Sequence, residues 1–307
     1  MRNNELTLKY QNALKSFLEK IKQDKYIIAA ILAGSLYHDV VWEKSDIDMI
    51  LIVDDSKRPS HECCLMEDEI IFNVFCYSSL EFRRRFESSL TGSQFHSWLN
   101  KTKLLYSKDE SILSIYDNIS AASENDKDLL LLENGTWSVA GLVKAQRYLY
   151  VKKDPLYCAY DLCKETIHKL AAIEVLTNNI IAEKEVILQA IQLNPGFFDL
   201  IYTELLQHHK DEQYMANIIR RIEQYLEDKT PALFKIILDF LQEENKICPI
   251  TEIERKISIL SLPKAVLVEP LEWLVQKKYI EKFATSVRLT GKSWVEVDEA
   301  AYFYGGE

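Results

Sequence analysis

Two aspartates, one residue apart, stand at the start of an apolar run. In the segment SDIDMILIV, Asp46 and Asp48 lead into five apolar residues that end at Val53. Side chains alternate between the two faces of a strand, so the two carboxylates should project from the same face. Two negative charges held together repel each other unless a cation lies between them, and Mg²⁺ prefers oxygen ligands. The spacing therefore predicts a divalent-cation site.

A Gly-Ser pair precedes these aspartates, at the end of another apolar run. The segment YIIAAILAGS ends in Gly34 and Ser35. Glycine permits a tight turn and lets the backbone approach a phosphate closely. Ser35 adds a hydroxyl at a position where a following helix would present free N–H groups to an anion. A phosphate-binding turn beside a pair of metal-binding carboxylates, at the ends of neighbouring strands, indicates chemistry on a nucleotide.

This ordered motif resembles the nucleotidyltransferase superfamily of the DNA polymerase β type. Over roughly residues 10–220 the chain is also similar to the small bacterial members that adenylylate antibiotics such as aminoglycosides and lincosamides. The resemblance implies that a hydroxyl of a small molecule attacks the α-phosphorus of a nucleoside triphosphate, with ATP the expected donor of AMP, and that pyrophosphate leaves. Asp46 and Asp48 would then hold Mg²⁺, and Gly34 and Ser35 would grip the β- and γ-phosphates.

One position departs from the family pattern. Members usually carry a third carboxylate on the strand that corresponds to residues 69–77, and Asn73 stands there instead. An amide is a poor magnesium ligand and cannot act as a base. Asp161 or Glu165 in the helical part could supply the base, whereas Glu69 shares the face of Asn73 but comes four residues earlier. Three functions therefore stay open: a transferase acting on small molecules, a catalytically impaired nucleotide-sensing regulator, and a protein-adenylylating enzyme.

The elements that must position the site fill the first 120 residues. The apolar spacing predicts a helix over residues 4–23 and strands over 26–34, 47–53, 69–77 and 102–108, with a charged helix over 79–90. We therefore expect an α/β domain (1–122) with a mixed sheet of about five strands. Residues 127–228 keep helical spacing, with breaks at Asp154-Pro155 and Asn194-Pro195, and predict an all-α helical bundle (123–229).

The last segment predicts a third domain (230–307) that is winged-helix-like. Three amphipathic helices, the first beginning at Pro231 and the second capped in part by Thr251, precede a hairpin that turns near residues 290–292. This segment carries ten Lys and Arg against twelve Asp and Glu. DNA-binding modules usually show a basic stripe. The balance favours contact with protein, including a homodimer, over contact with DNA.

Composition limits the class of protein. The 307 residues carry a formal net charge of −10, which argues against a general nucleic-acid binder and suits a cationic acceptor. The six cysteines form no C-x-x-C pair, so the sequence predicts free thiols in a reducing compartment. The polar beginning of the chain and its short apolar stretches predict a cytoplasmic protein without membrane contact.

Overall fold

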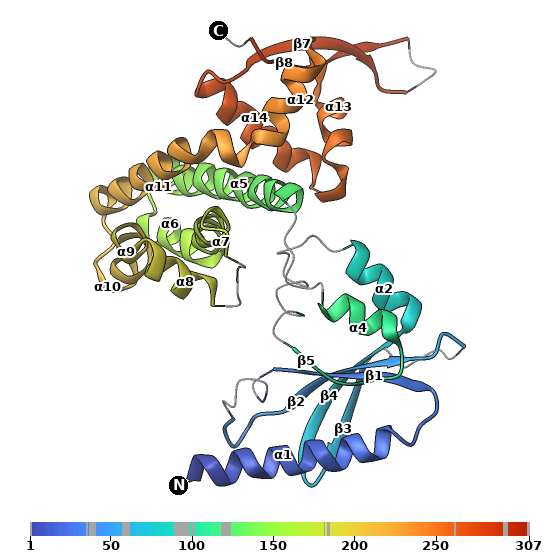
Figure 1. Ribbon diagram of the computed structural model, residues 1–307. Coiled ribbons are helices and arrows are strands. Elements are labelled where there is room, and N and C mark those ends of the chain that lie inside the picture. The colour runs from blue at the N-terminus through green and yellow to red at the C-terminus, as the bar shows by residue number, and fades with distance from the viewer. Residues whose placement is uncertain are drawn as a thin grey trace. The chain divides into compact units, whose positions relative to one another are not determined.

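The computed structural model describes residues 2–34, 36, 41–56, 62–88, 99, 102–117, 124–180, 182, 185–260, 262–290 and 294–305. The chain separates into two compact units, Met1–Ser123 and Glu124–Glu307 (Figure 1). The predicted division into three domains, 1–122, 123–229 and 230–307, stays a prediction.

The first unit is a mixed sheet with helices on both faces. Its strands follow the order β3-β4-β2-β1-β5 across the sheet, and of the described strand pairs only β2 and β4 run parallel. Its elements are α1 (Arg2–Ile21), β1 (Ile27–Ala33), β2 (Ile47–Val53), β3 (Glu62–Glu67), β4 (Ile70–Ser78), α2 (Ser79–Ser88), β5 (Lys103–Ser107) and α4 (Glu110–Asp117). The predicted α/β class is confirmed.

Alternation along the strands gives the sheet two cores. On one face, Met49 and Leu51 pack with α1, where Phe17 stacks on Phe72 of β4 with ring centroids 4.5 Å apart. On the other face, Ile50 and Ile52 pack with apolar residues of α2 and α4. Asp48 shares the parity of Ile50, so the predicted site lies on the face that bears α2 and α4.

The sequence-based prediction did not locate strand β3. Strand β3 pairs with β4 as a hairpin whose two turn residues, Asp68 and Glu69, have φ values of 46° and 64°. Such left-handed turns usually carry Asn or Gly. The turn carries Asp and Glu instead, so residue type does not reveal the hairpin or the strand ECCLME that enters it.

The second unit is mainly helical. Its first part comprises α5 (Glu124–Gln146), η2 (Arg147–Val151), α6 (Pro155–Asp161), η3 (Leu162–Thr166), α7 (Ile167–Thr177), α8 (Val186–Leu193), α9 (Pro195–Phe198), η4 (Asp199–Glu204), α10 (Leu205–Gln207) and α11 (Glu212–Leu233). The segments η2, η3 and η4 are π-helical turns. Asp154 caps α6 by accepting a hydrogen bond from the backbone N–H of Tyr157, and Pro195 begins α9, as the predicted breaks required.

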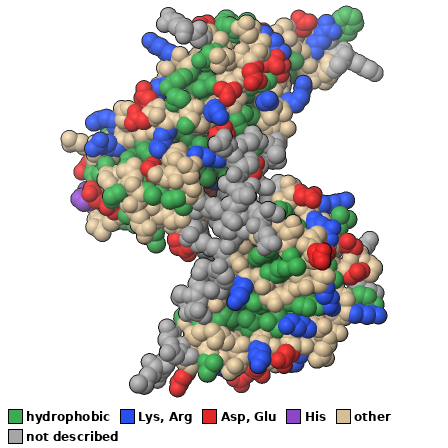
Figure 2. Space-filling model, in the orientation of Figure 1, with side chains coloured by type: hydrophobic (Ala, Val, Ile, Leu, Met, Phe, Trp, Pro, Cys, Tyr) green, Lys and Arg blue, Asp and Glu red, His purple; other side chains and the backbone are tan. Residues whose placement is uncertain are grey.

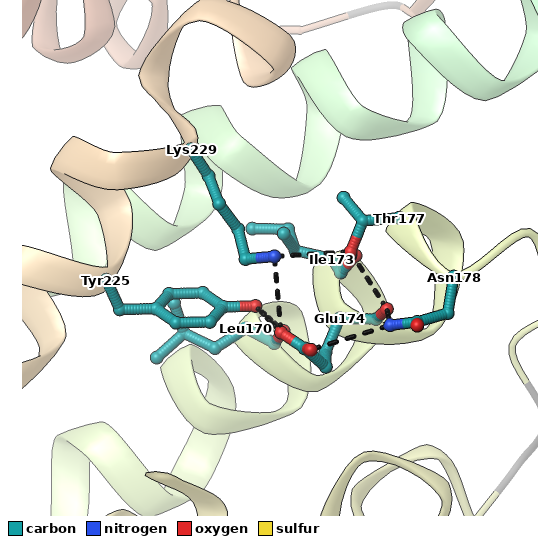
Figure 3. A network of polar contacts seen from close by, with 7 residues as sticks. All are labelled: Leu170, Ile173, Glu174, Thr177, Asn178, Tyr225 and Lys229. Carbon is teal, nitrogen blue, oxygen red and sulfur yellow. Dashed lines mark hydrogen bonds and ion pairs between the residues drawn. The ribbon is translucent and has the colours of Figure 1, made fainter. Parts of the chain in front are cut away.

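Helix α5 lies at the centre of this unit, against α7, α11 and α14. A buried polar network joins α7 to α11 (Figure 3): the hydroxyl of Tyr225 donates to Oε2 of Glu174 at 2.7 Å, and Nζ of Lys229 lies 3.3 Å from the same oxygen. Glu174 is only 7% exposed, so this network provides the partners that a buried carboxylate needs.

The C-terminal part adds a small antiparallel sheet of order β6-β8-β7. Its elements are α12 (Lys235–Glu244), β6 (Cys248–Pro249), α13 (Ile250–Lys256), η5 (Ser258–Leu260), α14 (Lys264–Gln276), β7 (Glu281–Arg288) and β8 (Glu296–Phe303). The hairpin turn was predicted near residues 290–292, of which 291 and 292 lie outside the described residues.

Two details of the C-terminal prediction were wrong. Pro231 does not begin a helix but lies in the last turn of α11, which continues to Leu233. Thr251 lies inside α13, and its backbone N–H donates to a carboxylate oxygen of Glu299 on β8 rather than its side chain capping the helix.

None of the described helices is long and apolar enough to cross a membrane. The six cysteines are free thiols.

Candidate active site

The end of β1 brings its backbone against Asp48, the second aspartate of the pair. Ala33 is the register partner of Asp48 on the neighbouring strand, and Gly34 follows with φ of +76°. A Cβ on Gly34 would collide with Oδ2 of Asp48 and would lie 3.2 Å from its Cγ. Only glycine combines this backbone conformation with this approach. The predicted phosphate-binding position therefore lies directly beside the predicted metal ligand.

The structure brings Asp46, Asp48 and Asn73 together. Asp48 and Asn73 are register partners on the parallel strands β2 and β4, so their side chains leave the same face of the sheet. Nδ2 of Asn73 donates a hydrogen bond to Oδ2 of Asp46 at 2.5 Å. All three side chains are half-buried. Strand alternation and register thus assemble two carboxylates and one amide at the start of β2.

A residue that the sequence analysis did not single out anchors the segment before Asp46. The hydroxyl of Tyr10, on α1, donates to the carbonyl oxygens of Ser45 at 2.7 Å and Trp42 at 3.4 Å. The same segment closes on itself, because the backbone N–H of Ser45 donates to the carbonyl of Trp42 at 2.9 Å. Burial, and to a lesser extent the charge of Asp46, raise the pKa of Tyr10.

The apolar spacing along α1 could have identified Tyr10 as a buried residue. It lies three, four and seven residues before Ala13, Leu14 and Phe17 on the buried stripe of α1, and is 4% exposed. Leu8, in contrast, belongs to the apolar spacing but is 56% exposed. The stripe shows that Tyr10 is buried, but not that its hydroxyl reaches a segment more than thirty residues further along the chain.

The donor set fits a magnesium ion in part. Asp46 and Asp48 offer oxygen ligands on one face, which is the chemistry that Mg²⁺ prefers. Within the described ranges, no group of three or more His, Cys, Asp or Glu side chains is arranged to hold a metal. Ser35, the predicted second phosphate contact, lies outside the described residues.

The carboxylates considered as replacements for a base at position 73 have other surroundings. Glu69 lies in the β3–β4 turn, where Oε2 is 3.5 Å from Nζ of Lys9. Asp161 is buried, and its Oδ1 accepts a hydrogen bond from Nζ of Lys144 at 2.5 Å. Glu165 is exposed on η3. A role as base for Asp161 or Glu165 stays a prediction.

Comparisons with known proteins concern the domain and its fold. Residues 15–111 match the family described as "Polymerase beta, Nucleotidyltransferase". A crystal structure of a nucleotidyltransferase-like protein from Exiguobacterium sibiricum superimposes with a TM-score of 0.67 at 14% identity, covering 97% of this chain and 100% of that one, and so shows a shared fold. The comparison with curated proteins found no match. The chain thus carries, at residues 15–111, a domain of the polymerase β-type nucleotidyltransferase superfamily.

Proposed function

We propose that the protein is a Mg²⁺-dependent nucleotidyltransferase that moves AMP from ATP to a hydroxyl of a small molecule and releases pyrophosphate. One observation carries the proposal: Asn73 donates to Asp46 and is the register partner of Asp48, and Asp48 lies against the backbone of Gly34, which has φ of +76°. Carboxylates for a cation and a side-chain-free backbone for a phosphate are what triphosphate binding requires.

Each residue has a defined task in this proposal. Asp46 and Asp48 hold the cation, and Gly34 leaves room for a phosphate. When bound, Mg²⁺ supplies charge neutralisation for the triphosphate. A new bond forms between the acceptor oxygen and the α-phosphorus, and the bond from that phosphorus to the bridging oxygen breaks. Pyrophosphate takes the bonding electrons, and the hydroxyl proton passes to water.

The proposal also gives the C-terminal part of the chain a role in binding other proteins. Its order α12-β6-α13-α14-β7-β8, with the sheet order β6-β8-β7, supports the proposal that this part is a winged-helix-like module. Acidic and basic side chains are interspersed over the visible face of the second unit (Figure 2). This mixture, with ten basic and twelve acidic residues in 231–307, favours a docking or homodimer role over DNA binding. The proposal includes a cytoplasmic location, which the six free thiols favour.

A nucleotide-sensing regulator is the second candidate function. Asn73, an amide, stands among the site carboxylates and donates to Asp46, and an amide cannot accept the acceptor's proton. A regulator would bind ATP with Mg²⁺ without releasing pyrophosphate. It would change the binding of a partner to the C-terminal module when ATP is added.

Incubation with α-³²P-ATP and Mg²⁺ tests the proposal. We expect label to move to hydroxylated small molecules, with aminoglycosides screened first, and one pyrophosphate to be released for each label. Label that appears on protein would instead identify a protein-adenylylating enzyme. ATP binding with neither transfer nor pyrophosphate release would favour the regulator.

A further inference from the structure

Asn73 makes a short polar contact within the candidate site. Its Nδ2 donates to Oδ2 of Asp46 at 2.5 Å, and its backbone is in register with Asp48. Only the amide nitrogen can face a carboxylate at this distance, because the amide oxygen would be repelled. Asn73 therefore contacts one aspartate and lies beside the other across the sheet.

This contact restricts the orientation of Asp46. Asp46 precedes β2, so the ladder of the strand does not hold its backbone as it holds that of Asp48. The amide of Asn73 fixes one carboxylate oxygen, and the planar carboxylate then has a defined direction for the other. Hydrogen bonds of this kind orient metal ligands, and losing them typically costs about 10–100-fold in metal affinity.

The charge of Asp46 and Asp48 limits the number of cations that the two carboxylates can bind. Asp46 and Asp48 together carry two negative charges, and Asn73 adds none, so one divalent cation neutralises the cluster. Within the part of the chain that the structure describes, no third acidic, histidine or cysteine side chain completes a metal-binding group. A second cation in the absence of nucleotide would lie beside the first without a ligand charge to balance it.

We propose that Asn73 is a positioning residue that orients Asp46 for a single divalent cation. This inference rests on the proposed function only in that Asp46 and Asp48 are the cation ligands. The amide acts through Asp46 and does not itself hold the metal. Its neutrality sets the number of cations that the protein binds before nucleotide arrives.

Titration of the metal-free protein with Mn²⁺, followed by the loss of the free-ion electron paramagnetic resonance signal without nucleotide, tests the inference. We expect the wild-type chain to bind one Mn²⁺. Asn73→Ala should bind one Mn²⁺ at least about tenfold more weakly, because Asp46 loses its hydrogen bond. Asn73→Asp should bind more tightly than wild type, because a third carboxylate replaces the amide. Cys64→Ala, which changes the exposed register partner of Asn73 on β3, should leave the affinity unchanged.

The opposite directions expected for the two Asn73 variants separate the inference from a folding defect, which would weaken binding in both. Wild-type affinity in Asn73→Ala, an equal loss in Cys64→Ala, or two Mn²⁺ of comparable affinity on the wild-type chain would overturn the inference and leave the proposed function standing. No Mn²⁺ binding by the wild-type chain would instead remove the metal site on which both depend.

Discussion

At the scale of single residues, Gly34 tests whether the backbone beside Asp48 must lack a side chain. Gly34→Ala places a Cβ against Oδ2 of Asp48 in a backbone conformation with positive φ. We expect a loss of about 1–3 kcal/mol in the free energy of unfolding, together with weaker binding of ATP. Urea denaturation and calorimetric titration measure the two effects.

Gly196→Ala is the matched control for this change. Gly196 lies in α9 without a positive φ, and a Cβ added there would meet no described atom within 4 Å. Alanine is the better helix former, so this variant should gain up to about 1 kcal/mol. Equal effects of the two substitutions would show that Gly34 has no special role.

Substitution of Tyr10 tests whether its hydroxyl anchors the segment that leads into Asp46. Tyr10→Phe removes the hydrogen bonds to the carbonyls of Ser45 and Trp42 while keeping the ring in the core. We expect unfolding to become easier by about 1 kcal/mol, and ATP affinity to fall because Asp46 is held less firmly. Tyr150→Phe, at a side chain 48% exposed, should change stability by less than about 0.5 kcal/mol. An unchanged ATP affinity in Tyr10→Phe would argue against the anchoring role.

At the scale of elements, the sequence predicts features that are local in the chain and misses those that depend on neighbouring strands. Gly34, Asp46 and Asp48 could be found because strand alternation is local and the motif lies within fifteen residues. The contact between Asn73 and Asp46 depends on which strands are neighbours, and residue spacing does not contain that information. Strand β3 could not be found because its turn places Asp68 and Glu69, not glycine, in left-handed conformations.

Substitutions of Glu174 test how much the polar network between α7 and α11 stabilises the second unit. Glu174→Ala leaves the Tyr225 hydroxyl and the Lys229 ammonium without their carboxylate partner (Figure 3). We expect a loss of about 2–4 kcal/mol in the free energy of unfolding, because the removed partner is buried. Glu174→Gln should cost less, because its amide oxygen can still accept from Tyr225. Urea denaturation of both variants measures the difference.

The exposed pair between Lys153 and Glu212 is the control for the buried network. Its atoms are 2.8 Å apart, but both side chains are more than half exposed. Glu212→Ala should therefore cost less than about 1 kcal/mol. A loss in Glu174→Ala no larger than that in Glu212→Ala would show that the buried network contributes nothing beyond a surface pair.

At the scale of the whole molecule, the two compact units should unfold separately, and only the first should respond to nucleotide. Cys76 reports on the first unit and Cys158 on the second. Burial, with a smaller effect of Cys63, raises the pKa of Cys76 to about 11, and burial, with the charges of Asp161 and Asp154, raises that of Cys158 to about 12. Both thiols should therefore stay protonated and unreactive at pH 8 until they are exposed.

Thiol labelling at pH 8 in increasing urea measures these transitions. ATP with Mg²⁺ at about 100 times its dissociation constant should stabilise the first unit by about 2.7 kcal/mol. The labelling of Cys76 should then move to higher urea while that of Cys158 stays in place. Chelation of Mg²⁺ should abolish the shift. Transitions that move together would show that the two units unfold as one.

The central claim is that Asp46 and Asp48 form a nucleotide site that needs a divalent cation. Isothermal titration of ATP, with Mg²⁺ and with a chelator, into the wild-type chain and into Asp46→Ala/Asp48→Ala tests it most directly. We predict that the wild-type chain binds ATP only with Mg²⁺ and that the folded double variant does not bind it. Wild-type ATP affinity in the double variant, or no ATP binding by the wild-type chain with Mg²⁺, would contradict the claim.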